Sequence, residues 1–294
     1  MRYEVIAEGA LLGEGPVWCP DGTLVTTHMG RDKLRRTDPR TGRSEVIARF
    51  PGGANSAQLA SDGGFVITNN GGIDFSKFAE MMKLDPSKLE YVPGTPGIQR
   101  MRPDGQVSYL ADQGLSAPND LIVARDGTLY FTDPPPNGGV GAQGKPGRVF
   151  SFTQKAGLKV IARDFQYCNG IALSPEERLL IVEANGLMWI DPATGARDWF
   201  VERVGGPSSV GDGFKFDREG RVYCAAPMDH AILIFDKTGK KLDQIDLGPN
   251  AMVTNLCFGG ADGRTLFTVE LSPGRICAIE NLPAPGLPLR PFPV

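Results

Sequence analysis

Six polar residues begin similar short stretches of this chain, and their types and spacing suit chemistry. Each is a carboxylate or an amide followed by an apolar run, and in five of the six copies a glycine stands eight positions later. The six residues are Glu14, Asn55, Asn119, Asn169, Asp212 and Asn255. In the Asn169 copy, Glu177 takes the place of the glycine. If the six side chains meet, they supply hard oxygen ligands, which suit Ca²⁺ well and Mg²⁺ or Mn²⁺ less well.

A structural role is the alternative for each of these residues. Asn and Asp side chains often hold turns together by bonding to nearby backbone groups, and a single polar residue of this kind favours that interpretation. A set of six at equivalent positions favours the binding of a metal ion or another ligand. Gly, Ala or Val would serve a purely structural repeat.

The elements that must position these residues follow from the repeat. Its copies are 41, 64, 50, 43 and 43 residues apart, and a β-rich run follows each turn, as at residues 24–27 and 129–132. Strand, hairpin and strand at this period are typical of four-stranded propeller blades. We therefore predict an all-β protein, a single six-bladed β-propeller domain over residues 1–294. The innermost strand of each blade lines the channel, so the six polar residues would face one axis.

The ends of the chain and one long connection complete this prediction. The last copy has room for three strands, over residues 255–258, 266–269 and 275–280. The N-terminal segment 2–7 would supply a fourth strand and close the ring, which leaves no long edge exposed. The extra length of the second unit predicts an insertion at about residues 72–98, in the region from blade two to blade three. A short helix within it, over residues 75–84, would pack on the outer rim or form a flap over the binding face.

Composition excludes several other classes of protein. Among 294 residues, 38 are Gly and 24 are Pro, which argues against long helical bundles. The net charge of −3 comes without a basic stripe, so we expect neither nucleic acid nor a membrane as a partner, but a small-molecule substrate. Five Cys without a CxxC spacing predict reduced thiols and a cytoplasmic location. Two His argue against a His-rich metal site and a Ser-His-Asp triad.

Several strings of residues, in the same order along almost the whole chain, resemble one family. They include Gly13-Glu14-Gly-Pro-Val-Trp18, Pro118-Asn119-Asp-Leu-Ile-Val123, Asn169-Gly-Ile-Ala-Leu-Ser-Pro175 and Gly211-Asp212-Gly213. These strings are similar to the senescence marker protein/gluconolactonase (regucalcin-like) family. The resemblance implies a six-bladed propeller that holds a divalent cation, usually Ca²⁺, in its channel. Members hydrolyse lactones, and related enzymes hydrolyse organophosphates.

The resemblance also implies roles for individual residues. Glu14, Asn169 and Asp212 match the metal ligands of the family, and Asn119 matches an amide that contacts metal or substrate. Several sugar-lactone enzymes of the family carry an Arg two residues before that amide. Here the position is Ala117.

Together, the ring and the resemblance lead to one hypothesis of function. A divalent cation, with Ca²⁺ favoured and Mg²⁺, Mn²⁺ or Zn²⁺ as alternatives, would be held by Glu14, Asn119, Asn169 and Asp212. It would polarise a lactone carbonyl while Asp212 activates water, with Asn119 as the second catalytic residue. Asn55, Asn119 and Asn255 would bind substrate. A phosphotriesterase-like hydrolase and a non-enzymatic Ca²⁺-binding or interaction propeller are the alternatives.

Overall fold

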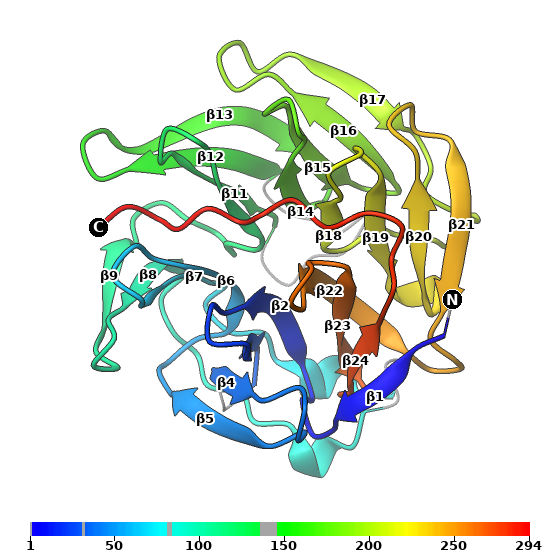
Figure 1. The fold of residues 1–294 in the computed structure, drawn as a ribbon. Coiled ribbons are helices and arrows are strands. Elements are labelled where there is room, and N and C mark those ends of the chain that lie inside the picture. Colours follow the sequence, from blue (N-terminus) through cyan, green and yellow to red (C-terminus); the bar gives the residue numbers. More distant parts are fainter. Residues whose placement is uncertain (1, 31–32, 81–83, 136–145) are drawn as a thin grey trace.

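Six antiparallel sheets of four strands each are arranged around one axis, as Figure 1 shows. The structure is a computed structural model, and it describes residues 2–30, 33–80, 84–135 and 146–294. The prediction of an all-β, six-bladed propeller is confirmed. In the first five blades the strands follow one another in chain order from the channel outward, and in blade six the outermost strand is β1.

The first three blades contain strands β2 to β13. Blade one consists of β2 (Gly13–Trp18), β3 (Leu24–His28), β4 (Leu34–Thr37) and β5 (Ser44–Ala48). Blade two consists of β6 (Ala54–Leu59), β7 (Phe65–Asn69), β8 (Gly97–Met101) and β9 (Val107–Ala111). Blade three consists of β10 (Leu121–Val123), β11 (Leu129–Asp133), β12 (Gly147–Thr153) and β13 (Gly157–Phe165).

The remaining blades contain strands β14 to β24 and the first strand of the chain. Blade four consists of β14 (Cys168–Leu173), β15 (Leu179–Glu183), β16 (Gly186–Ile190) and β17 (Arg197–Val201). Blade five consists of β18 (Phe214–Phe216), β19 (Val222–Ala226), β20 (Ala231–Phe235) and β21 (Lys241–Asp246). Blade six consists of β22 (Met252–Gly259), β23 (Thr265–Ser272), β24 (Ile276–Ile279) and β1 (Glu4–Ala7).

The N-terminal strand closes the ring. β1 pairs antiparallel with β24, with Glu4 opposite Ala278 and Val5 opposite Cys277. Blade six is therefore built from both ends of the chain, and the closure predicted from the sequence is confirmed. Pairing β1 with β24 satisfies backbone groups that an open edge would expose.

The turn between the first two strands of each blade requires a left-handed backbone. The five glycines of the repeat have φ between +71° and +89°. Glu177, which stands at the sixth position, also has a positive φ of +64°. This conformation costs a non-glycine residue free energy. The carboxylate of Glu177 forms an ion pair with Arg290, with Oε1 at 2.7 Å from the guanidinium nitrogen.

Hydroxyl groups connect neighbouring blades at the channel. Thr27 Oγ1 in blade one donates to the Asn55 carbonyl of blade two at 2.6 Å. Thr132 Oγ1 in blade three donates in the same way to the Asn169 carbonyl of blade four at 2.6 Å. Thr68 in blade two also donates to a carbonyl of blade three, that of Asn119. These bonds fix the backbone of three channel residues against the preceding blade.

Glycines after three of the channel residues allow equally close approach between blades. A Cβ on Gly15 would lie 2.5 Å from Ser56 Cα in blade two. A Cβ on Gly170 would press against the Asp212 carbonyl oxygen, and one on Gly213 would overlap the Asn255 side chain. The residue after Glu14, Asn169 and Asp212 therefore has to be glycine, because the next blade occupies the space of a side chain.

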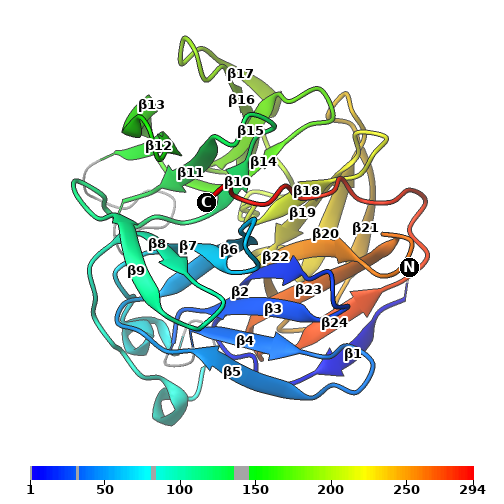
Figure 2. The same ribbon diagram turned by 60° about the vertical axis from the view of Figure 1, so that its left-hand side comes forward.

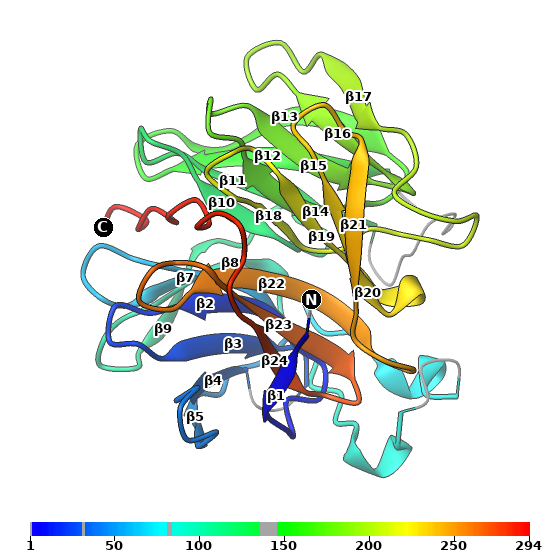
Figure 3. The same cartoon turned by 45° about the vertical axis from the view of Figure 1, so that its right-hand side comes forward.

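The two ends of the channel carry different additions. The insertion contains two short 3-10 helices, η1 (Phe75–Phe78) and η2 (Pro86–Lys88); residues 81–83 of the expected helix lie outside the described part. A third such helix, η3 (Pro227–Asp229), lies in blade five. Figure 3 shows η1, η2 and the C-terminal segment 282–294 at opposite ends of the strands.

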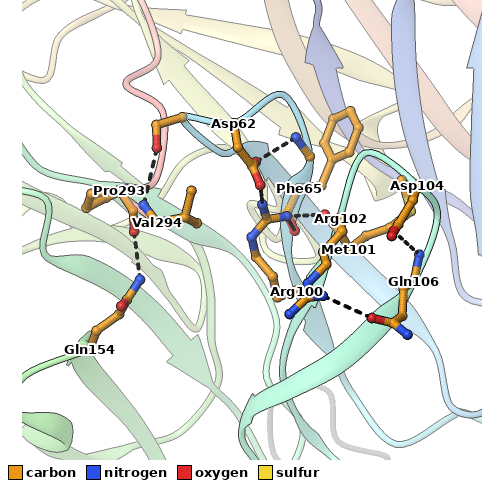
Figure 4. Close-up of polar contacts among 12 residues, drawn as sticks. Asp62, Phe65, Arg100, Met101, Arg102, Asp104, Gln106, Gln154, Pro293 and Val294 are labelled. Atoms are coloured by element: carbon orange, nitrogen blue, oxygen red, sulfur yellow. Dashed lines mark hydrogen bonds and ion pairs between the residues drawn. The ribbon is translucent and has the colours of Figure 1, made fainter.

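The C-terminal segment crosses the turn end of the propeller (Figures 1 and 2). Leu287 N donates to the Phe216 carbonyl at 3.0 Å in blade five, and Phe292 N donates to Leu59 at 2.8 Å in blade two. Figure 4 shows its end, where Gln154 Nε2 donates to the Pro293 carbonyl at 3.1 Å. The segment thus ties distant blades together.

Apolar clusters fill the spaces between the blades. One of them joins blades four and five and includes Leu180, Val182, Phe214 and Leu233, all nearly inaccessible. In the described residues, no helix is long and apolar enough to cross a membrane. Because the apolar clusters hold neighbouring blades together, the blades form the frame on which the channel residues are fixed.

The close approach at Gly170 generates a test of this packing. We expect Gly170→Ala to lower the free energy of unfolding by about 2 kcal/mol or more, because its Cβ would push blade five away from blade four. Gly206→Ala is the control, since its Cβ would meet nothing closer than Ser209 Oγ at 3.7 Å. Urea unfolding followed by circular dichroism measures both. Equal effects of the two substitutions would contradict the explanation.

Candidate metal and substrate site

The structure brings the six ring residues to the inner face of their blades. Glu14, Asn55, Asn169 and Asn255 lie on the innermost strands and are buried. Asn119 and Asp212 lie just before β10 and β18 and are partly exposed. These last two residues are therefore the more exposed members of the ring.

A third carboxylate joins the site, which sequence reasoning missed. Asp120 follows Asn119 directly and is 1% exposed. Asn255 Nδ2 donates to both of its oxygens, at 2.9 and 3.0 Å, and to Glu14 Oε2 at 3.3 Å. One amide of blade six thus links carboxylates of blades one and three. The available signal was a carboxylate inside an otherwise apolar run after Asn119.

Burial and mutual repulsion act on these acids together. The pKa values of Glu14 and Asp212 are raised well above the ordinary range, first by loss of hydration and then by the neighbouring carboxylates. Burial also raises the pKa of Asp120, against the charge of Lys215, which lowers it. Lys215 Nζ donates to the Phe214 carbonyl at 3.1 Å. Negative charge at the axis is therefore incompletely balanced by the protein.

The oxygen atoms around these acids fit a hard cation. Asn119 Oδ1 and Asn169 Oδ1 are buried and have no hydrogen-bond partner among the described residues. Buried acceptors are nearly always paired, so two unpaired ones beside carboxylates fit a cation that the oxygens would coordinate. Within the described ranges, no three His, Cys, Asp or Glu side chains are grouped to hold a metal ion. A metal site at this place would therefore need the amide oxygens as ligands in addition to carboxylates.

A tyrosine contacts one of these amides. Asn169 Nδ2 donates to the Tyr167 hydroxyl oxygen at 2.8 Å, which leaves Asn169 Oδ1 as the unpaired end. Burial and the charges of Asp212 and Glu14 raise the pKa of Tyr167, which stays a neutral phenol. Sequence reasoning missed Tyr167, although it stands two residues before a predicted ligand.

A second layer of polar residues holds the loops that lead to the channel. It occupies the ends of the second strands. Asp133 Oδ1 accepts from the backbone N–H groups of Ser116 and Ala117 at 2.9 and 2.7 Å. Glu183 accepts in the same way from Gln166 and Tyr167, at 2.7 and 3.2 Å. The backbone just before Asn119 and Asn169 is therefore anchored from behind.

The insertion packs against residues of blades one and six. Phe75, Ala79 and Leu84 form an apolar cluster with Leu12 and Met29 of blade one, together with Leu271 of blade six. Leu12 lies two residues before Glu14. The insertion therefore contacts the loops at the carboxylate end of the channel.

The opposite end of the channel opens into a cavity of about 800 Å³. Gln58 and Lys215 of the inner strands line it, together with the turns of blades one, two and six and residues 285–291 of the C-terminal segment. Lys215 thus lies between this cavity and Asp120, whose pKa it lowers.

Comparison with known proteins identifies the family. The family model described as "SMP-30/Gluconolactonase/LRE-like region" matches residues 12–270, so the chain belongs to this family. It is 27% identical to a gluconolactonase of Zymomonas mobilis, over 90% of this chain and 77% of that protein. The resemblance seen in the sequence is thereby confirmed.

Solved structures of similar proteins agree. A gluconolactonase of Xanthomonas campestris is 25% identical, with a TM-score of 0.74 over 95% of this chain and 90% of that one. A calcium-binding regucalcin of Agrobacterium tumefaciens, 19% identical, shares the fold with a TM-score of 0.74 over 99% of this chain and 96% of that one.

The raised pKa values predict how the cation-free protein responds to pH. An acid whose pKa is raised on folding binds more protons in the folded state, so stability falls as pH rises above about 4, the ordinary carboxyl value. In EDTA, we expect the melting temperature of Asp212→Asn to rise relative to that of the parent protein as the pH is raised from 4.5 to 7.5. Added Ca²⁺ should stabilise the parent protein at neutral pH. A melting-temperature difference that does not change with pH would contradict this account.

Proposed function

We propose that this protein is a divalent-metal-dependent lactonase that opens a cyclic ester by adding water. The gluconolactonase-like family and the gluconolactonases among its relatives support hydrolysis of a lactone. One observation carries the metal dependence: the unpaired oxygens of Asn119 and Asn169 lie in the same channel as the under-compensated carboxylates Glu14 and Asp212. Oxygen donors without His or Cys favour Ca²⁺ over Zn²⁺.

The chain's own residues divide the work of the reaction. Glu14 and Asn169, both buried, would hold the ion, which would act as a Lewis acid toward the lactone carbonyl. Asn119 and Asp212 are partly exposed and face the substrate. Asp212 takes a proton from the attacking water as the water oxygen bonds to the carbonyl carbon. The ring C–O bond then breaks, and the proton passes to the leaving alkoxide to give a hydroxy acid.

Metal removal tests the first part of this proposal. Dialysis against EDTA should abolish hydrolysis of glucono-1,5-lactone, and Ca²⁺ should restore it. The reason is that the negatively charged carboxylates cannot replace the positive charge of the ion, which would polarise the lactone carbonyl. Hydrolysis is followed by base consumption in a pH-stat, with parallel additions of Mg²⁺, Mn²⁺ and Zn²⁺. Activity that survives complete chelation would refute metal dependence. Hydrolysis of paraoxon but of no lactone would favour a phosphotriesterase.

Two substitutions separate ion binding from proton transfer. We expect Asp212→Asn to lower kcat by about 100-fold or more, since general-base catalysis contributes on that order, while Ca²⁺ binds within about tenfold of the parent affinity because an amide oxygen remains. Glu14→Gln should mainly weaken Ca²⁺ binding. Asp38→Asn, at a partly exposed turn between β4 and β5, is the control. Unchanged turnover in Asp212→Asn would remove its role as base. Ca²⁺ binding by the parent protein without turnover of any lactone would favour a binding propeller.

A further inference from the structure

We infer that Asn55 is a fixed hydrogen-bond donor that selects hydroxylated lactones, and that Asn70 sets its orientation. The substrate class in this inference rests on the proposed lactonase function. Asn55 belongs to the ring of channel residues, and its position is equivalent to those of Glu14 and Asn119. Which end of its amide is available decides what it can bind.

A relay from the backbone fixes that choice. Gly72 N donates to Asn70 Oδ1 at 2.9 Å. A backbone N–H can only donate, so the oxygen of Asn70 must face Gly72 and its NH₂ group must face elsewhere. Asn70 Nδ2 then donates to Asn55 Oδ1 at 3.1 Å. The oxygen of Asn55 is thereby used, and its NH₂ group is the end left over.

The NH₂ group of Asn55 is buried without a partner. Asn55 is 2% exposed, and no atom of the described residues accepts a hydrogen bond from its Nδ2. A buried unpaired donor is costly, and a ligand oxygen that accepts from it removes this cost on binding. Asn119 and Asn169 leave an oxygen unpaired instead. The ring therefore contains oxygens that suit a cation and, in blade two, a donor that repels one.

A donor in this position selects among lactones. In the proposed reaction the cation would polarise the lactone carbonyl, so the carbonyl oxygen would not be the atom that accepts from Asn55. A plain aliphatic lactone then has only its ring oxygen, a weak acceptor, whereas a hydroxylated lactone brings several good acceptors. A site that holds a buried polar group for such a hydroxyl discriminates against an analogue without it. Asn55 thus favours polyhydroxylated over aliphatic rings.

The insertion is the source of this orientation. Gly72 lies where the insertion begins, and Gly71 and Gly72 have φ of +81° and +96°. Gly71 N donates to Asn69 Oδ1 at 2.9 Å, parallel to the bond from Gly72 to Asn70. Two consecutive left-handed residues aim two N–H groups back at the end of β7, which is a conformation that glycine adopts without strain.

Two substitutions and their combination test the relay. Asn55→Leu removes the donor. Asn70→Asp still accepts from Gly72 but cannot donate, so the Asn55 amide should rotate and present its oxygen to the channel. Each should lower kcat/KM for glucono-1,5-lactone about tenfold, the size of one hydrogen bond, and change it less than twofold for δ-valerolactone, which has the same ring without hydroxyls. Asn250→Asp, at an exposed loop, is the charge control.

The double variant separates the relay from a simple charge effect. If Asn70 acts through Asn55, Asn70→Asp should have no further effect in the Asn55→Leu background. A charge effect would persist there and would overturn the relay. Equal losses on both lactones would overturn the selection of hydroxylated substrates, because they would place Asn55 on the shared carbonyl.

Binding of a ring that cannot be hydrolysed separates this inference from the proposed function. By calorimetry, 1,5-anhydro-D-glucitol should bind the parent protein and bind Asn55→Leu and Asn70→Asp about tenfold more weakly, the loss of one hydrogen bond. That result without turnover of any lactone would refute the lactonase and retain the donor. Lactone turnover with no effect of either substitution on turnover or binding would refute the role of Asn55 as donor and retain the lactonase.

Discussion

Negative charge gathered on the propeller axis is the constraint on which the rest of this structure depends. Glu14, Asp120 and Asp212 come from three different blades and influence one another's protonation. Lys215 offsets part of this charge at Asp120. Carboxylates so placed repel one another unless a cation or protons intervene. The blades must therefore hold in place a group of side chains that would otherwise move apart.

The blades hold these side chains in place with hydrogen bonds made behind the channel. Hydroxyls of Thr27 and Thr132 hold the carbonyls of ring residues in the next blade, and Asp133 and Glu183 hold the loops that lead into the channel. These bonds act on the backbone, so they fix where each side chain starts without using its functional atoms. The unpaired oxygens of Asn119 and Asn169 remain available for a ligand.

The repeat made the fold and the position of the ring predictable from the sequence. Its phase located the six channel residues, the turn positions with positive φ and the strand that closes the ring. Asp120 and Tyr167 could not be found in this way, since they occur in one copy each and matter through contacts that span blades or loops. The orientation of each amide depends on its partners in space. Four Asn at equivalent positions look alike in the sequence.

A ring of equivalent residues can bind an unsymmetrical substrate only if its members differ, and amides allow this without a change of residue type. The Tyr167 hydroxyl takes the nitrogen of Asn169 and leaves an oxygen, whereas Asn70 takes the oxygen of Asn55 and leaves a nitrogen. Asn255 gives its nitrogen to two carboxylates. Three Asn thus face the site with different chemistry, because a carboxamide has a donor end and an acceptor end, and its contacts leave one or the other available. In this chain, specificity is therefore set by the residues behind the ring as much as by the ring.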